Sequence, residues 1–189
     1  MTNPCRTPWQ RKWLGLDVTS KAVQRMADEA EKFTARWFRN HPHSSLLVLA
    51  GEYGTGKSHV ARAIHRFATT AAWSAFHENK AWGARIPGSL YLRWPEVADA
   101  FKEGQYGVLE DCFTESLVIL DDVGAEHDPS KNAADKFCQV LTRRERLFTL
   151  VTTNISPALW PERFDGRIAD RLLRNSVVVE LSDTRSYSL

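Results

Sequence analysis

The chain has 189 residues, of which 25% are charged and 43% are apolar, and its formal net charge is +2 at neutral pH. This length suits a single domain with its own core, and the composition excludes a disordered or fibrous chain. No apolar run approaches the roughly 20 residues of a membrane-spanning helix, and the basic N-terminus lacks the apolar stretch of a secretion signal. We therefore expect no membrane partner.

The charge distribution and the cysteines bear on partners and compartment. Residues 1–50 carry a net +4, residues 51–130 a net −5 and residues 131–189 a net +3. Basic ends are compatible with nucleic-acid binding, but an excess of this size does not establish it. The three cysteines are odd in number, far apart and in no Cys-x-x-Cys pair, so neither a disulfide framework nor a structural zinc site is expected. A reducing cytoplasm is the expected location.

One helix and one buried strand are predicted before the first glycine-rich stretch. Apolar side chains recur at helical spacing at Val23, Met26, Ala30, Phe33 and Trp37. Asp17, Thr19 or Ser20 could cap this helix, which we expect to end near residues 40–42. The continuous apolar run SLLVLAG, residues 45–51, is typical of a strand buried on both faces.

The same two patterns alternate through the rest of the chain. A helical stripe that begins at Lys57 includes Val60, Ile64, Phe67 and Ala71. Strands are predicted at residues 89–94, 116–122, 147–154 and 176–181. Between them, Pro95 opens a helix with Val97, Ala98 and Phe101, and another helix contains Ala133, Phe137, Val140 and Leu141. Strands that alternate with helices predict a parallel sheet with helices on both faces.

The stretch WSAFHENKAWGARIPGS, residues 73–89, fits this alternation poorly. It is long for a connection, and Trp73, Phe76 and Trp82 make it apolar for a free loop. One interpretation is an extension of the preceding helix, followed by a turn packed on the domain. The other is a surface element whose aromatic side chains stack on bases or contact a partner.

A phosphate-binding loop is predicted between the first strand and the second helix. Its sequence, Gly51-Glu52-Tyr53-Gly54-Thr55-Gly56-Lys57-Ser58, satisfies the pattern GxxxxGK[ST] in the context that this pattern requires. Glycines let backbone N–H groups and the helix N-terminus approach phosphate oxygens, and Lys57 brings a positive charge to the β- and γ-phosphates. The alternative is a chance glycine turn. We take this loop, with the following His59, as the nucleotide-binding segment.

Paired carboxylates follow the strand predicted at 116–122. Asp121 ends an apolar run, and ligands bind at the carboxyl ends of strands in open α/β sheets. We expect Asp121 and the Ser58 hydroxyl to hold Mg²⁺, while Asp122 orients and deprotonates an attacking water. Ordinary solvation of a loop by two carboxylates is the alternative.

Asn154 ends the strand predicted at 147–154. Its neutral amide can hydrogen-bond both a phosphate and a water molecule. If this strand lies between the other two, Asn154 comes near the γ-phosphate and acts as a sensor of it. By itself, the sequence Thr-Thr-Asn would be an ordinary turn.

Three motifs in order after the phosphate loop give the chain a more specific resemblance. LVILDDVGAE (117–126), VTTN (151–154) and GRIADRL (166–172) resemble the AAA+ domain of DnaC/DnaI-type helicase loaders, and the IstB transposition-helper ATPases are similar too. The resemblance implies a P-loop NTPase of the AAA+ type, a three-layer α/β sandwich with a five-stranded parallel sheet and no clear C-terminal lid domain. It implies an ATPase domain at 13–189 after a tail at 1–12.

The resemblance also implies roles for three arginines. Arg171, before the final leucine of GRIADRL, corresponds to a finger that reaches into the ATP site of a neighbouring subunit, and Arg167 would support it. Arg185 lies near a family arginine that contacts the nucleotide, with a one-residue slip in the alignment. The alternative for the first two is a solvated helical face paired with Asp165 and Asp170.

Three departures from the family are visible, one of them being the 73–89 segment, which is longer than expected between the first helix and the second strand. Asp122 stands where the family often has glutamate, which suggests slower turnover. The loaders also carry a separate N-terminal domain that docks on the replicative helicase, whereas about a dozen residues precede the resemblance here. We therefore expect another chain to supply docking, or another target.

The sequence thus predicts an ATP- and Mg²⁺-dependent ATPase that acts in DNA replication like a helicase loader. It would self-associate through its ATP sites and bind single-stranded DNA, with a replicative helicase as protein partner. An IstB-like DNA-binding transposition helper, with a transposase as partner, is the alternative. Two further alternatives are a small-molecule kinase with the same phosphate loop and a non-hydrolysing scaffold.

Overall fold

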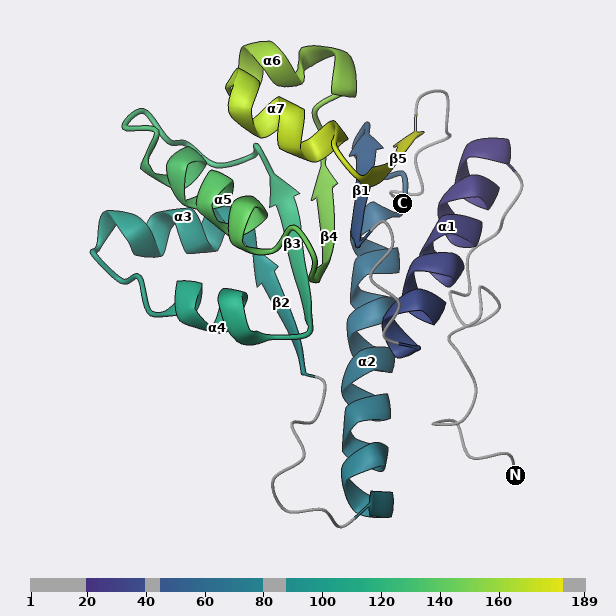
Figure 1. Cartoon of the computed structure of the whole chain (residues 1–189). Helices are drawn as coiled ribbons and strands as arrows, with labels where there is room; N and C mark the ends of the chain where they lie inside the picture. The colour runs from purple at the N-terminus through teal and green to yellow at the C-terminus, as the bar shows by residue number, and fades with distance from the viewer. Residues whose placement is uncertain (1–19, 40–44, 80–87, 182–189) are drawn as a thin grey trace.

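The computed structural model describes residues 20–39, 45–79 and 88–181, with the helical backbone alone for residues 71–79. Its centre is a five-stranded sheet in the order β2-β3-β4-β1-β5, with every pair of neighbours parallel (Figure 1). The strands are β1 (Leu46–Gly51), β2 (Ser89–Arg93), β3 (Leu117–Val123), β4 (Phe148–Thr153) and β5 (Ser176–Leu181). This confirms the predicted α/β fold and puts the carboxyl ends of all five strands along one edge.

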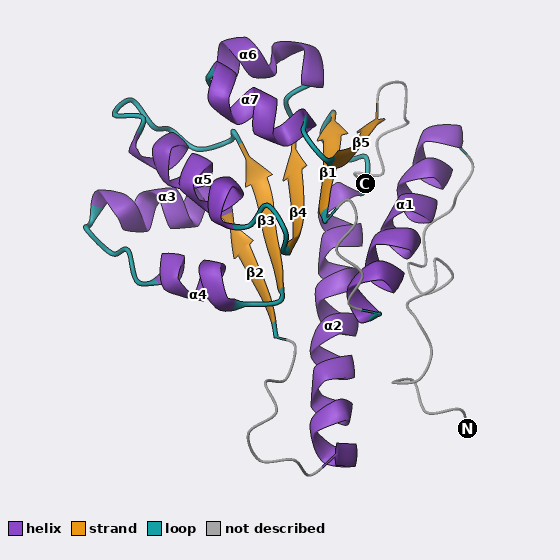
Figure 2. Cartoon of the chain, viewed as in Figure 1, coloured by secondary structure: helices purple, strands orange, loops and turns teal. Residues whose placement is uncertain are grey.

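Helices cover both faces of the sheet (Figure 2). One face is covered by α1 (Lys21–Phe38) and α2 (Lys57–Asn79). The other is covered by α3 (Trp94–Lys102), α4 (Val108–Thr114) and α5 (Asn132–Arg143), with the 3₁₀ turn η3 (Pro157–Leu159), α6 (Trp160–Arg163) and α7 (Gly166–Leu173) beyond them. Successive residues of β1 and β3 alternate between two separate hydrophobic clusters, which explains why these strands read as continuous apolar runs.

The structure confirms one of the predicted helix caps and differs from the local predictions in two places. Ser20 caps α1 by accepting a hydrogen bond from the Val23 N–H at 3.1 Å, whereas Asp17 and Thr19 lie outside the described residues. Helix α4 was not predicted, because it is short, follows Gly107 without a side-chain cap, and buries few apolar residues. Strand β2 ends one residue early, because α3 begins at Trp94.

The unusual stretch at 73–89 is described in part. Helix α2 continues to Asn79, which confirms the helix-extension interpretation for the first half of the stretch. Trp82 lies outside the described residues, as do the tail at 1–12 and the boundary at residue 13. Within the ranges that the structure describes, no helix is long and apolar enough to cross a membrane.

Arg144, directly after α5, is a buried arginine that connects the end of α4 to the start of β4. It is 2% exposed, and its guanidinium donates to the carbonyls of Cys112 at 2.5 Å, Glu115 at 2.9 Å and Phe148 at 2.7 Å. Burial lowers the pKa of Arg144 to about 10. Cys112 and Glu115 lie at the end of α4, and Phe148 begins β4, so one side chain satisfies carbonyls of two backbone segments.

Replacing Arg144 with methionine should destabilise the fold. The substitution keeps much of the apolar length but leaves three carbonyls, two of them in buried hydrogen bonds, without their donor, which should cost about 3 kcal/mol. Arg146→Met, at an exposed position two residues along, is the matched control and should change stability by less than about 0.5 kcal/mol. Urea unfolding followed by circular dichroism measures both; equal midpoints for the two variants would rule out this role.

Candidate nucleotide-binding site

The predicted phosphate loop joins β1 to α2 at the carboxyl edge of the sheet. Gly51 has a φ of +136°, and a Cβ atom there would lie 2.6 Å from the carbonyl oxygen of Leu181 on β5. Gly54 and Gly56 also have positive φ angles, of 74° and 89°. Glycine is required at these points because side chains are strained at such angles, and a side chain at Gly51 would also strike β5. The loop is thereby a close-wrapped backbone cradle, which is the shape that a phosphate group needs.

Lys57 lies within this loop with its ammonium group directed back at the backbone. It is 4% exposed, and Nζ donates to the carbonyls of Gly51 at 2.8 Å and Glu52 at 2.6 Å and to the Thr55 hydroxyl at 3.2 Å. Burial lowers the pKa of Lys57 to about 8, against the opposing effect of the nearby aspartates. The loop therefore carries a concentrated positive charge at its centre.

Asp121 lies in β3 and is fully buried. Its Oδ2 accepts a hydrogen bond from the Tyr91 hydroxyl on β2 at 2.5 Å, and its Oδ1 accepts one from the Thr152 hydroxyl on β4 at 2.6 Å. Burial and this donation raise the pKa of Tyr91 to about 12. Both oxygens of the predicted metal-binding carboxylate are thus held from the two neighbouring strands.

Asp122 follows at a bulge in β3. Leu120 pairs with Val151 and Val123 with Thr153, so Asp121 and Asp122 together oppose Thr152 alone. Asp122 has a φ of 61°, and its N–H donates to the Thr152 hydroxyl at 2.9 Å. The bulge places two successive carboxylates opposite one residue of β4, an arrangement that the sequence alone does not reveal.

Strand β4 lies between β1 and β3, which is the condition that the prediction set for Asn154. Asn154 directly follows β4 and is half-buried at the same edge as the phosphate loop. The loop after β3 packs on this segment, because a Cβ at Gly124 (φ +89°) would lie 2.3 Å from Ile155 Cδ1. The Glu126 carboxylate accepts a hydrogen bond from the Gly124 N–H at 2.7 Å and so closes that loop. This contact explains structurally why glycine and glutamate occur in the Gly-Ala-Glu part of the motif.

The oxygen donors at this edge suit Mg²⁺. A serine hydroxyl and a carboxylate are hard ligands, and Mg²⁺ uses one or two protein groups beside phosphates and water. Over the described ranges, no group of three or more His, Cys, Asp or Glu side chains could hold a metal by itself. Ser58 is the second residue of α2 and Asp121 lies on β3, so the donor set fits a magnesium ion that arrives with a nucleotide.

The predicted finger arginines lie elsewhere, on α7. Arg167 is exposed and donates to Asp165 at 2.7 Å, and it also pairs with Asp135 at 3.4 Å. Arg171 is half-buried; its Nε donates to the Thr142 hydroxyl on α5 at 2.7 Å. The ion pair of Arg167 agrees with the solvated-face alternative for that residue. Arg185 lies outside the described residues.

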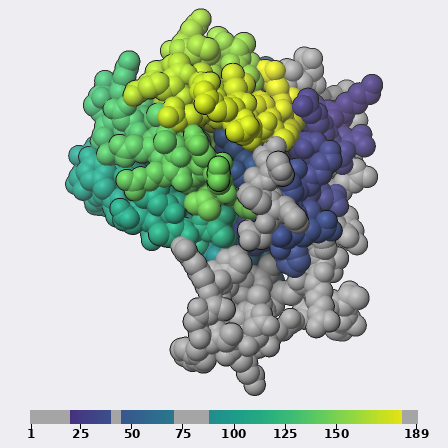
Figure 3. All heavy atoms as spheres, viewed as in Figure 1, coloured from purple at the N-terminus to yellow at the C-terminus, as the bar shows by residue number. Residues whose placement is uncertain are grey.

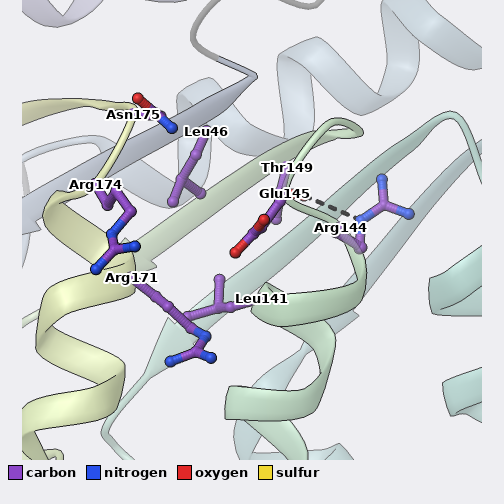
Figure 4. Close-up of a pocket in the computed structure, with 8 residues that line it drawn as sticks. All are labelled: Leu46, Leu141, Arg144, Glu145, Thr149, Arg171, Arg174 and Asn175. Atoms are coloured by element: carbon purple, nitrogen blue, oxygen red, sulfur yellow. Dashed lines mark hydrogen bonds between the residues drawn. The ribbon is translucent and has the colours of Figure 1, made fainter.

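A pocket of about 200 Å³ lies beside Arg171, between α5 and α7 (Figure 4). It is lined by Leu46, Leu141, Arg144, Glu145, Thr149, Arg171, Arg174 and Asn175. Leu46 begins β1 and pairs with Thr149 near the start of β4, so the pocket lies toward the amino ends of the strands. In the space-filling view, the yellow surface of α7 adjoins the green surface of α5 (Figure 3). Because Arg171 lines a pocket toward the amino ends of the strands, it is far from the phosphate loop of its own chain, which lies at their carboxyl ends.

Two polar residues at the site were missed by sequence reasoning. Tyr91 was part of a predicted strand, and Thr152 was part of the Thr-Thr-Asn motif, but neither received a role. The available signal was a hydroxyl-bearing residue on each of two strands, which becomes informative only when the strand order puts β3 between β2 and β4.

The chain matches the family model described as IstB-like ATP binding protein over residues 17–189. It matches no curated protein in sequence. Its fold is similar to a crystal structure of DnaI, with a TM-score of 0.69 and 21% identity over 95% of this chain and 94% of that one. It is also similar to the DnaC helicase loader, with a TM-score of 0.65 and 16% identity over 89% and 96% of the two chains.

AMPPCP-bound DnaA from Aquifex aeolicus is a third similar structure, with a TM-score of 0.68 and 14% identity over 92% of this chain and 51% of that one. At these identities, the three likenesses establish the fold. The family match establishes more, because it spans nearly the whole chain. This protein belongs to the family of IstB-like ATP binding proteins.

Proposed function

We propose that the protein is an AAA+ ATPase that binds ATP with Mg²⁺ at the Gly51–Ser58 loop and hydrolyses it. The observation that carries this proposal is the meeting of three strand ends at one edge: the loop with buried Lys57 after β1, the two aspartates on β3, and Asn154 after β4. A lone phosphate loop would serve many activities. A carboxylate pair and an amide beside it suit hydrolysis of the terminal phosphate.

Each residue has a separate task in this proposal. Backbone N–H groups of the loop and the Lys57 ammonium bind the phosphates. Ser58 and Asp121 hold Mg²⁺, which when bound neutralises charge on the β- and γ-phosphates. Asp122 orients the attacking water and takes its proton, and Asn154 hydrogen-bonds the γ-phosphate.

Arg171 would complete the site of a neighbouring subunit. What supports this is its distance from its own loop: Leu46, beside the Arg171 pocket, and Gly51 lie at opposite ends of β1, roughly 16 Å apart. A guanidinium in that position serves a phosphate only if another copy presents one. ATP binding and self-association are therefore coupled in this proposal.

The proposed target is DNA together with a DNA-bound protein ring, as for a helicase loader acting in replication. Similarity of fold to DnaI, DnaC and DnaA supports this reading. A transposition helper that binds DNA with ATP and recruits a transposase is the second candidate, and the match to the IstB-like family model favours it. Both candidates require ATP-dependent binding to DNA.

Binding to single-stranded DNA should depend on ATP and fall steeply with salt. ATP-linked assembly would align several copies along one strand, and neutralised phosphates release counterions. Fluorescence anisotropy of a labelled oligonucleotide, with and without ATP, measures this. Lys57→Ala is the control and should gain no binding from ATP. Absence of binding by the wild-type protein at low salt with ATP would reject the DNA target and leave a purely protein target.

A further inference from the structure

We infer that Tyr91 is a positioning residue for magnesium binding: with Thr152, it holds the Asp121 carboxylate in the orientation that the ion requires. The inference rests on the proposed function and adds a residue to it. Asp121 is 0% exposed, and each of its oxygens accepts one hydroxyl, from Tyr91 at 2.5 Å and from Thr152 at 2.6 Å. These two hydrogen bonds fix the plane of the Asp121 carboxylate, because rotation of the carboxylate would break both of them, and both are charge-assisted.

The strand order places the Tyr91 and Thr152 hydroxyls on the two sides of Asp121. Strand β3 lies between β2 and β4, and Arg93 of β2 pairs with Asp121. Tyr91 lies two residues before Arg93, on the same face of the sheet, and its long side chain reaches the carboxylate diagonally. On the other side, the bulge of β3 brings both Asp121 and Asp122 opposite Thr152. Each of the two hydroxyls therefore comes from a different neighbouring strand.

Arg62 sets the direction of the Tyr91 hydroxyl. Its Nε donates to the phenol oxygen at 3.2 Å, which leaves the phenol proton for Asp121. Arg62 lies on α2, four residues after Ser58, so the two side chains share a helix face. The ring of His65, also on α2, lies 5.7 Å from the Tyr91 ring and restricts it further.

The contact series from Arg62 through Tyr91 to Asp121 therefore connects α2 with β3. These two elements carry the two groups proposed to hold Mg²⁺, Ser58 and Asp121. Residues that orient a metal ligand typically change metal affinity by 10- to 100-fold when they are removed. We accordingly assign Tyr91 an effect on the ion and not on the nucleotide alone.

Tyr91→Phe should weaken metal affinity about tenfold while leaving metal-free nucleotide affinity unchanged. The full chain is mixed with a non-hydrolysable ATP analogue, and Mn²⁺ is titrated in while electron paramagnetic resonance reports the free ion. Nucleotide affinity without metal and the thermal midpoint are measured on the same samples. Tyr106→Phe is the matched control, because its hydroxyl accepts a hydrogen bond from Asn132 at 3.2 Å away from the site.

Arg62→Met is the second variant, at an exposed position where the loss leaves the core intact. It should weaken Mn²⁺ binding about threefold through the lost hydrogen bond to the phenol. Equal Mn²⁺ affinity in wild type, Tyr91→Phe and Arg62→Met overturns the inference, as does an equal loss of metal-free nucleotide affinity in Tyr91→Phe. If wild type with the analogue binds no Mn²⁺, the proposed function fails, and the inference fails with it.

Discussion

An equal mixture of the Arg171→Ala and Asp122→Asn variants should hydrolyse ATP, although each variant alone should be nearly inactive. Under the proposed roles, Arg171→Ala would keep an intact site but supply no finger to its neighbour. Asp122→Asn would supply a finger but could not activate water in its own site. In a randomly mixed assembly, about one interface in four pairs an intact site with an intact finger, so part of the activity should return.

The expected loss for Arg171→Ala is large, because a finger in phosphoryl transfer contributes about 10³–10⁵ in rate. In the structure, Arg171 does not lie near its own phosphate loop. Arg171 lines a pocket at the amino ends of the strands and donates to Thr142, whereas the loop lies at the carboxyl ends. We therefore expect the loss of activity in Arg171→Ala to arise between subunits.

Steady-state phosphate release at concentrations that support assembly measures the effect. Arg163→Ala, on the neighbouring α6 and exposed, is the matched control and should keep the wild-type rate. Normal hydrolysis by Arg171→Ala alone would identify Arg171 as a surface arginine. A mixture that co-assembles but stays inactive would argue that Arg171 acts within its own subunit.

Much of the fold followed from the sequence, for a physical reason. Strands β1, β3 and β4 are buried on both faces, so their apolar runs are unbroken and hard to mistake. The phosphate loop could also be predicted from the sequence, because its glycines have positive φ angles that other residues adopt only with strain. These features depend on local backbone and burial, which a sequence records directly.

What the sequence could not supply was the arrangement across strands. The role of Asn154 was predicted on the condition that β4 lies between β1 and β3. Only the strand order in the structure shows that this condition is met. Tyr91 and Thr152 contact Asp121 because of strand order and a bulge, neither of which leaves a pattern in the residues themselves. The role of Arg144 could not be predicted for another reason: arginines are mostly exposed, and its burial depends on carbonyls at the end of α4 and at the start of β4, two segments far apart in the sequence.

Lys57→Ala should lose most of the affinity of the protein for ATP. The ammonium group is buried in the loop and is held by backbone carbonyls of Gly51 and Glu52, from which it can turn to phosphate oxygens. Removing one partner of such a buried charged contact costs about 3 kcal/mol, or about 100-fold in affinity. Asp122→Asn is the matched comparison, since its change affects the attacking water and should leave binding intact.

Isothermal titration of a non-hydrolysable ATP analogue with Mg²⁺ into wild type, Lys57→Ala and Asp122→Asn tests most directly whether this loop is the ATP site. Thermal unfolding of each sample first establishes that all three are folded. The account predicts saturable binding by wild type and by Asp122→Asn, and binding by Lys57→Ala weakened about 100-fold. Binding by folded Lys57→Ala with the affinity of wild type, or no binding by wild type, would contradict it.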